Sequence, residues 1–249
     1  MDSFIPRIGG KKLLRGKICE MFPPVDAFNR YIEVFGGAAW VLFHKERHAG
    51  LEVYNDLDGE MVNMLRCVKY HLSELLKEMQ GVYNSREIYK EILSQSSCMG
   101  LTDIQRAARY FYRIKLSFGS DGRSYGCNRA GIKNSVDKIK AVSSRLYDKD
   151  VVIEHKDFDD LIRGYDRKTA FFYCDPPYFK TEKYYDVSFT QDDHERLKQR
   201  LSNIQGLFLL SYNDCAYTRE LYRDFNIHDV DRDNNLGKGR YKELIITNY

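Results

Sequence analysis

Short apolar stretches alternate with amphipathic stretches over both ends of the chain. The predicted strands are 31–35 (YIEVF), 51–55 (LEVYN), 151–155 (VVIEH), 171–174 (FFYC), 207–211 (LFLLS), 226–230 (NIHDV) and 243–248 (ELIITN). Apolar residues with helical spacing predict helices at 38–47, 58–79, 157–163, 192–203 and 216–224. A short helix is also predicted before Pro23. Strands and helices in alternation favour an α/β fold built on one sheet.

The pattern changes between about residues 82 and 149, where amphipathic helices dominate. REIYKEIL (86–93) and TDIQRAARYFYRIKL (102–116) space their apolar residues as helices do. The next stretch, FGSDGRSYGCNRAGIKNS, holds four glycines and is typical of a loop or hairpin. We therefore predict a discontinuous domain, residues 1–80 and 150–249, interrupted by a mainly helical domain, residues 81–149, called the insert from here on.

Positive charge gathers in the insert. Residues 83–149 carry 13 Lys and Arg against 6 Asp and Glu, whereas the whole chain of 249 residues has a net charge of only +3. A local surplus of this kind indicates a contact surface for an anionic partner, with nucleic acid as the first candidate. A solvated helical face is the alternative explanation.

Several classes of protein are disfavoured by what the sequence lacks. It has no N-terminal apolar segment of the signal-peptide type and no run of 18 apolar residues, so we expect no membrane partner and a cytoplasmic location. The six cysteines form no CxxC pair. His44 and His48 have the spacing of two metal ligands on a helix, but no third ligand accompanies them, so no metal is expected.

The first predicted strand and the turn after it have features of a nucleoside-binding site. Phe35 is followed by Gly36 and Gly37, which allow a ligand to approach the backbone closely. Asp56 ends the second strand about 20 residues later, where a carboxylate can accept hydrogen bonds from ribose hydroxyls. Asp56 could instead cap a helix, a role that Asp58 could also fill. The pattern indicates an adenosine-containing cofactor, either a dinucleotide or S-adenosylmethionine.

The predicted strand 171–174 runs directly into Asp175, Pro176, Pro177 and Tyr178. Two prolines end strand pairing and stiffen the chain, so the carboxylate and the ring are held in fixed positions. DPPY after an apolar strand resembles the catalytic motif of amino-methylating DNA methyltransferases. With IGGK (8–11), VFGG (34–37) and YND (54–56), the order of motifs resembles the class α, Dam-type adenine-N6 family over nearly the whole chain.

This resemblance implies a Rossmann-like S-adenosylmethionine-dependent methyltransferase that acts on N6 of an adenine flipped out of double-stranded DNA. It implies that Asp175 and the carbonyl of Pro176 accept the two amine hydrogens, that Pro177 keeps this corner rigid, and that Tyr178 stacks on the base. The cofactor-binding residues that it implies are Arg7, Lys11, Phe35, Gly36, Gly37, Asp56 and Asp175. The chain departs from the family at Arg7, where relatives often have an aromatic residue, and at Ala38-Ala39.

Recognition of DNA sequence is expected in the Gly-rich part of the insert. The candidate residues there suit base edges, stacking and phosphates: Arg123, Tyr125, Asn128, Arg129 and Lys133. Alternatives are methylation of cytosine N4 or of an RNA base, and a catalytically idle DNA-binding module. Serine is commoner than aspartate at position 175 in cytosine-N4 enzymes, so Asp175 favours adenine. A nicotinamide oxidoreductase is disfavoured because GxGxxG is absent.

Overall fold

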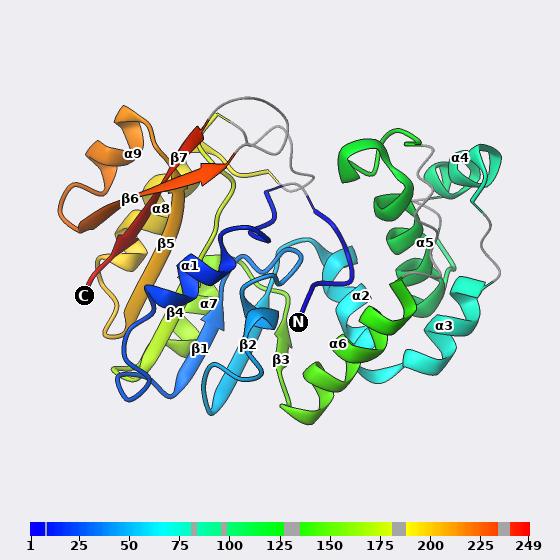
Figure 1. Cartoon of the computed structure of the whole chain (residues 1–249), viewed down its shortest axis with the longest axis horizontal. Coiled ribbons are helices and arrows are strands. Elements are labelled where there is room, and N and C mark those ends of the chain that lie inside the picture. Colours follow the sequence, from blue (N-terminus) through cyan, green and yellow to red (C-terminus); the bar gives the residue numbers. More distant parts are fainter. Residues whose placement is uncertain (8, 81–83, 96–98, 127–134, 181–187, 234–239) are drawn as a thin grey trace.

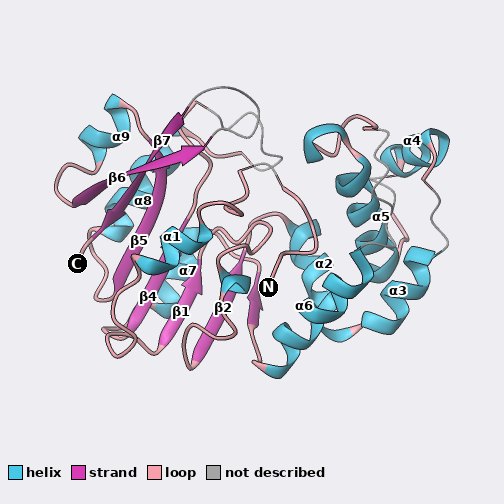
Figure 2. Cartoon of the chain, in the orientation of Figure 1, coloured by secondary structure: helices cyan, strands magenta, loops and turns pink. Residues whose placement is uncertain are grey.

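A twisted sheet with helices on both faces forms one side of the molecule, and a group of helices stands beside it (Figures 1 and 2). The computed structural model describes the chain except residues 8, 81–83, 96–98, 127–134, 181–187 and 234–239. The strands are β1 (Arg30–Glu33), β2 (Leu51–Asn55), β3 (Val152–Glu154), β4 (Ala170–Cys174), β5 (Leu207–Asn213), β6 (Asn226–Asp233) and β7 (Arg240–Thr247). The α/β sheet is therefore confirmed.

The helices fall into two sets along the chain. Outside the segment between β2 and β3, α1 (Arg15–Glu20) precedes the first strand, and α7 (Phe158–Tyr165), α8 (Gln191–Leu201) and α9 (Ala216–Leu221) connect later strands. Those between β2 and β3 are α2 (Gly59–Tyr70), α3 (Leu72–Gln80), α4 (Arg86–Ser94), α5 (Asp103–Leu116) and α6 (Val136–Asp148). Short 3-10 turns occur at η1 (Leu42–His44) and η2 (Phe118–Ser120).

The strand order in the sheet is β3-β2-β1-β4-β5-β7-β6. The first five strands of this order run parallel, and β7 pairs antiparallel with β5 and β6. The order reverses direction between β1 and β4, where Ile32 pairs with Phe172. Loops leave a parallel sheet to opposite sides at such a point, which opens a crevice at the carboxyl ends of the strands.

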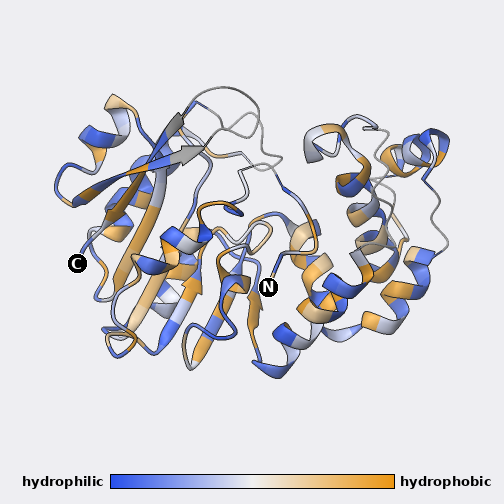
Figure 3. Ribbon diagram, in the orientation of Figure 1, coloured by the Kyte–Doolittle hydropathy of each residue, from blue (hydrophilic) through white to orange (hydrophobic). Residues whose placement is uncertain are grey.

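The core has a layer on each face of the sheet. Alternate residues of β4 point to opposite faces, so Phe171 and Tyr173 join one apolar cluster while Phe172 and Cys174 join the other. Burial on both faces explains why all five residues of β4 are apolar or aromatic. Figure 3 shows orange, the hydrophobic colour, along much of this sheet. The first cluster continues into α2, α5 and α6, so the helices beside the sheet share its core.

The predicted helix at 38–47 is wrong. Only the short turn η1 forms there, and Ala39 has a positive φ of 54°. The cause is a contact from another strand, because a Cβ at Gly36 would lie 2.1 Å from the ring of Tyr54, so the chain passes tightly over that ring. The Tyr54 hydroxyl then donates to the carbonyl of Gly37 at 2.8 Å. The predicted helix 58–79 is two helices, α2 and α3, with a break at His71.

Candidate active site

A cavity opens at the carboxyl ends of β1, β2 and β4, next to the point where the strand order reverses. Its empty space, counted out into open solvent, is about 980 Å³. The structure brings together at its wall most of the residues predicted from the sequence: Arg7, Lys11, Phe35, Gly36, Gly37, Asp56, Asp175 and Pro177. The cavity therefore joins the Gly turn to the DPPY segment.

Asp175 follows β4 and shares a buried corner with Lys11. Lys11 Nζ lies 2.7 Å from Asp175 Oδ1 and donates to the carbonyl of Gly9, and the Lys11 side chain is 4% exposed. The hydroxyl of Ser211, on β5, also donates to Asp175 Oδ1 at 2.8 Å. Burial raises the pKa of Asp175, and its neighbours Lys11 and Ser211 offset this only in part. Lys11 and Ser211 thus both hold the same carboxylate oxygen of Asp175, Oδ1.

Tyr178 and Pro176 are not among the residues that line the cavity, unlike Asp175 and Pro177. The Tyr178 ring stacks on Tyr212 with centroids 5.5 Å apart, and its hydroxyl donates to Glu243. The ammonium group of Lys11 lies 4.8 Å from the centroid of the same ring. Tyr178 is therefore fixed by three neighbours before any substrate binds.

Asp56 ties the Gly36-Gly37 turn after β1 to the segment that leads into α2. Its Oδ2 accepts from the backbone N–H of Gly37 at 2.6 Å, and its Oδ1 accepts from the N–H of Asp58 at 2.8 Å. Gly37 has a φ of 48°, in the left-handed region that favours glycine. The helix-capping role belongs to Asp58, whose Oδ1 accepts from two N–H groups in the first turn of α2. Asp56 is left at the cavity wall.

Arg7 completes a triangle with Asp58 and Tyr110 beside the cavity. Arg7 Nη1 lies 2.9 Å from Asp58 Oδ2 and donates to the Tyr110 hydroxyl at 3.0 Å, and that hydroxyl donates to Asp58 Oδ2 at 3.0 Å. Burial by itself raises the pKa of Asp58, but Arg7 and the other donors outweigh it, so the pKa lies below its usual value. Because Tyr110 belongs to α5, the triangle connects the cavity to the insert.

Three aromatic rings in the wall were missed as a group. The centroids of Phe35 and Phe158 are 5.7 Å apart, and Phe189 lies 5.8 Å from Phe35 and 5.9 Å from Phe158. Asp157 and Asp193 line the cavity near these rings. Phe35 was predicted because it precedes the Gly turn. Phe158 and Phe189 have no such motif beside them, and only the folded chain brings them next to Phe35.

Glu33 is a further residue that sequence reasoning missed. It ends β1, lines the cavity, and is 2% exposed, with the Tyr31 hydroxyl donating to Oε2 at 2.6 Å. Burial raises the pKa of Glu33 to about 8, with the nearby Asp175 and Glu52 adding to the shift. The sequence did offer a signal for Glu33, because this acidic residue ends an apolar strand, β1, which pairs with β4.

Two of the predicted DNA-binding residues, Arg123 and Tyr125, lie in the stretch that follows α5. Arg123 is exposed there, and the loop is closed by the N–H of Phe118 donating to Ser124 and by Gly126 donating to Leu116. Tyr125 instead packs into the insert, with its hydroxyl bound to Asn84 and its ring under Arg86. Asn128, Arg129 and Lys133 lie outside the described residues. Phe118, 74% exposed, was missed.

The two histidines do not share a helix. His44 belongs to η1, whereas His48 lies beyond it, largely buried, with Nε2 bonded to the carbonyl of Val41. Burial lowers the pKa of His48 to about 4. No three His, Cys, Asp or Glu side chains of the described residues are grouped so that they could hold a metal ion. Over the same residues, no helix combines the length and the apolar character that crossing a membrane requires.

Comparison with known proteins bears on this site. The chain is 29% identical to the Type II methyltransferase M1.LlaDCHI of Lactococcus lactis subsp. cremoris, over all of this chain and 96% of that protein. Among solved structures, the rRNA methyltransferase AviRa of Streptomyces viridochromogenes is similar at a TM-score of 0.40 and 11% identity, over 99% of this chain and 90% of that one. The sequence profile described as D12 class N6 adenine-specific DNA methyltransferase matches residues 8–236. The chain therefore belongs to this family of enzymes, which methylate N6 of adenine in DNA.

Proposed function

We propose that the enzyme takes its methyl group from S-adenosylmethionine and transfers it, at one recognition sequence, to an adenine flipped out of double-stranded DNA. The observation that carries this proposal is the position of Asp175, which lies in the wall of the cavity with one carboxylate oxygen already held by Lys11 and Ser211. We assign Asp175, Pro176, Pro177 and Tyr178 to the reaction.

The cavity suits a ligand that carries an aromatic base, a ribose and charges of both signs. Phe35, Phe158 and Phe189 offer ring faces for the base, and Asp56 offers a carboxylate for the ribose. The other charged lining residues are three cations, Arg7, Lys11 and Lys156, and four acids, Glu33, Asp157, Asp175 and Asp193. When bound, S-adenosylmethionine supplies an electrophilic methyl group on a sulfonium centre.

Asp175 and the Pro176 carbonyl would accept the two hydrogens of the adenine amine. This favours a pyramidal nitrogen with a localised lone pair, and the prolines limit the reorganisation that the step requires. Lys11 lowers the pKa of Asp175 against the effect of burial and so favours the ionised form, which accepts hydrogen bonds. Tyr178 would contact the face of the flipped base, a type of contact worth roughly 1–3 kcal/mol.

We assign DNA recognition to the insert, residues 81–149, between the two parts of the catalytic domain, 1–80 and 150–249. Candidates for DNA contact are Arg123, Tyr125, Asn128, Arg129 and Lys133, to which the structure adds Phe118 because of its exposure on the same loop. An exposed apolar ring can enter the base stack when a base leaves it. The relative in Lactococcus is a Type II methyltransferase, so we also propose a role in restriction-modification.

Transfer of labelled methyl groups from S-adenosylmethionine to unmethylated genomic DNA tests the proposal. We expect 6-methyladenine in the digested nucleosides, at one recurring motif when the sites are mapped. 4-Methylcytosine would contradict the assignment of the acceptor. Absence of transfer, with cofactor and DNA both shown to bind, would favour an idle DNA-binding module.

A further inference from the structure

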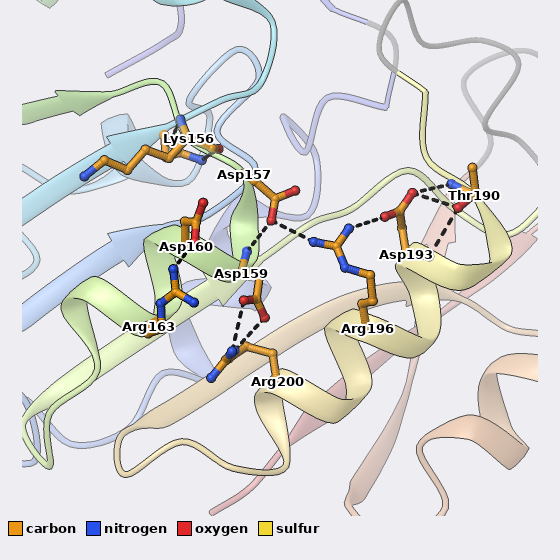
Figure 4. Close-up of polar contacts among 10 residues, drawn as sticks. Lys156, Asp157, Asp159, Asp160, Arg163, Thr190, Asp193, Arg196 and Arg200 are labelled. Carbon is orange, nitrogen blue, oxygen red and sulfur yellow. Dashed lines mark hydrogen bonds and ion pairs between the residues drawn. The ribbon is translucent and has the colours of Figure 1, made fainter.

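Arg196, on α8, joins the first turns of two helices at the edge of the cavity (Figure 4). Its Nη2 lies 3.0 Å from Asp157 Oδ1 and its Nη1 lies 2.5 Å from Asp193 Oδ1. Asp157 is the N-cap of α7, and Asp193 forms a capping box with Thr190 at the start of α8. Both aspartates line the cavity, whereas Arg196 is not part of its wall.

The same guanidinium also contacts the aromatic part of the wall. It lies 4.9 Å from the ring centroid of Phe158, which in turn contacts Phe35 and Phe189. A guanidinium at this distance is attracted to the ring face. One side chain therefore holds three lining residues, Asp157, Phe158 and Asp193, in a fixed arrangement.

The carboxylate of Asp157 retains a vacant acceptor. Its Oδ1 accepts from both Arg196 and the N–H of Asp159, while Oδ2 has no hydrogen-bond donor among the described residues and carries no dashed line in Figure 4. Asp157 lines the cavity next to Phe158 in the sequence, so this oxygen can accept from an amine on the edge of a base that stacks on the rings. Adenine carries such an amine and hypoxanthine does not.

Arg200 provides an internal comparison one helical turn further along α8. Its Nε and Nη2 bind Asp159 Oδ1 and Oδ2 at 2.6 and 2.9 Å, so it also ties α8 to α7 (Figure 4). Asp159 does not line the cavity. The two helices are thus held together by Arg200 and by buried Leu161 and Leu197, independently of Arg196.

We propose that Arg196 is a positioning residue for the cofactor, which orients Asp157 and Phe158 so that the site selects an adenine base. This inference rests on the proposed use of S-adenosylmethionine. Arg196 itself does not contact the cofactor. Arg196 acts through Asp157 Oδ2 and the ring of Phe158, which do.

Calorimetric titration of the full chain with S-adenosylhomocysteine tests the inference. In Arg196→Gln we expect the dissociation constant to rise about three- to tenfold, the range that corresponds to losing an exposed ion pair together with a ring contact. In the matched variant Arg200→Gln it should stay within about twofold of the wild type. Turnover at saturating cofactor should be the same in all three proteins, because Arg196 does not touch the reacting groups.

A second titration uses the S-inosyl analogue of homocysteine, in which a carbonyl replaces the amine. The wild type should prefer the adenine compound, and Arg196→Gln should lose most of that preference, with Arg196→Lys between them. Equal affinities in wild type and Arg196→Gln, or equal losses in Arg196→Gln and Arg200→Gln, would overturn the inference. Failure of the wild type to bind S-adenosylhomocysteine would instead contradict the proposed cofactor.

Discussion

Lys11 Nζ lies 2.7 Å from Asp175 Oδ1, although the two residues are 164 positions apart in the sequence. The pair is largely buried, with side-chain exposures of 4% and 17%. A buried carboxylate without a partner would tend to take up a proton and stop accepting hydrogen bonds. The finding therefore gives Lys11 a role in the charge state of Asp175 besides any contact with the cofactor.

Asp175→Asn should lower turnover by about a hundredfold or more, the scale seen when one preorganised hydrogen-bonding group of an active site is removed. The side chain keeps its shape, so we expect the affinity for S-adenosylhomocysteine to change much less than turnover. Single-turnover methylation and calorimetry measure the two quantities. Asp214→Asn is the control, since Asp214 follows β5 and pairs with Arg219 outside the cavity. Near-normal turnover in Asp175→Asn would remove Asp175 from the mechanism.

The pH dependence of the reaction should reflect the raised pKa of Asp175. The group loses its charge at a higher pH than an ordinary aspartate, so activity should fall on acidification before ordinary aspartates are protonated. Ser211→Ala removes a donor that favours the carboxylate and should move this acid limb to higher pH. Profiles of kcat/KM against pH for both proteins provide the measurement. An identical acid limb in the two would contradict this assignment.

Glu33 should make the fold less stable as the pH rises from about 4.5 to about 8. Its folded-state pKa is raised to about 8 from a reference value of 4.5, so the native protein keeps a proton that the unfolded chain loses in this window. Its contribution to the free energy of unfolding is complete below pH 4.5 and is lost as the pH rises through about 8. The loss is at most about 5 kcal/mol. Urea unfolding of Glu33→Gln without ligand should show a flatter dependence on pH than the wild type. Parallel curves for the two proteins would refute this.

Tyr110→Phe should destabilise the protein by about 2 kcal/mol, because the lost hydroxyl bonds two charged groups, Arg7 and Asp58. Tyr112→Phe on the same helix should cost less, since the Tyr112 hydroxyl bonds the neutral backbone of Ser85. Chemical unfolding of both variants measures the difference. Equal losses would mean that the triangle beside the cavity adds nothing beyond an ordinary hydrogen bond.

Phe118→Ala should weaken binding to specific DNA by about five- to a hundredfold, the range that corresponds to one lost stacking contact. Affinity for the cofactor should be unchanged, because Phe118 is not among the residues that line the cavity. Tyr147→Ala is the control, since Tyr147 is an exposed ring (64%) in the last turn of α6, outside the loop that carries Phe118. Fluorescence anisotropy with labelled duplexes would detect the change, and equal effects of the two variants would contradict a stacking role.

The sequence predicted the parts of the site that local pattern encodes. An apolar stretch followed by two prolines places Asp175 at the end of a strand, and Gly36-Gly37 marks the turn. Parallel strands then bring these ends together at one edge of the sheet. This reasoning required no contact between residues distant in sequence.

What the sequence did not predict depends on such distant contacts. The helix expected at 38–47 is absent because Tyr54, on the neighbouring strand, occupies the space over Gly36. Arg7 and its partner Tyr110 are 103 positions apart in the sequence, and Asp157 and Arg196 are 39 positions apart. A single sequence carries no periodic signal for pairs of this kind.

The position of the helices between β2 and β3 also has a consequence for biosynthesis. β1 and β2 leave the ribosome early, but β4, which pairs with β1 and carries the chain into Asp175, leaves only after α6. A nascent chain that ends before residue 170 has its glycine turn and basic helices without the carboxylate. Premature termination would therefore release fragments that cannot methylate DNA, and recombination within this stretch could replace the helices while leaving every strand intact.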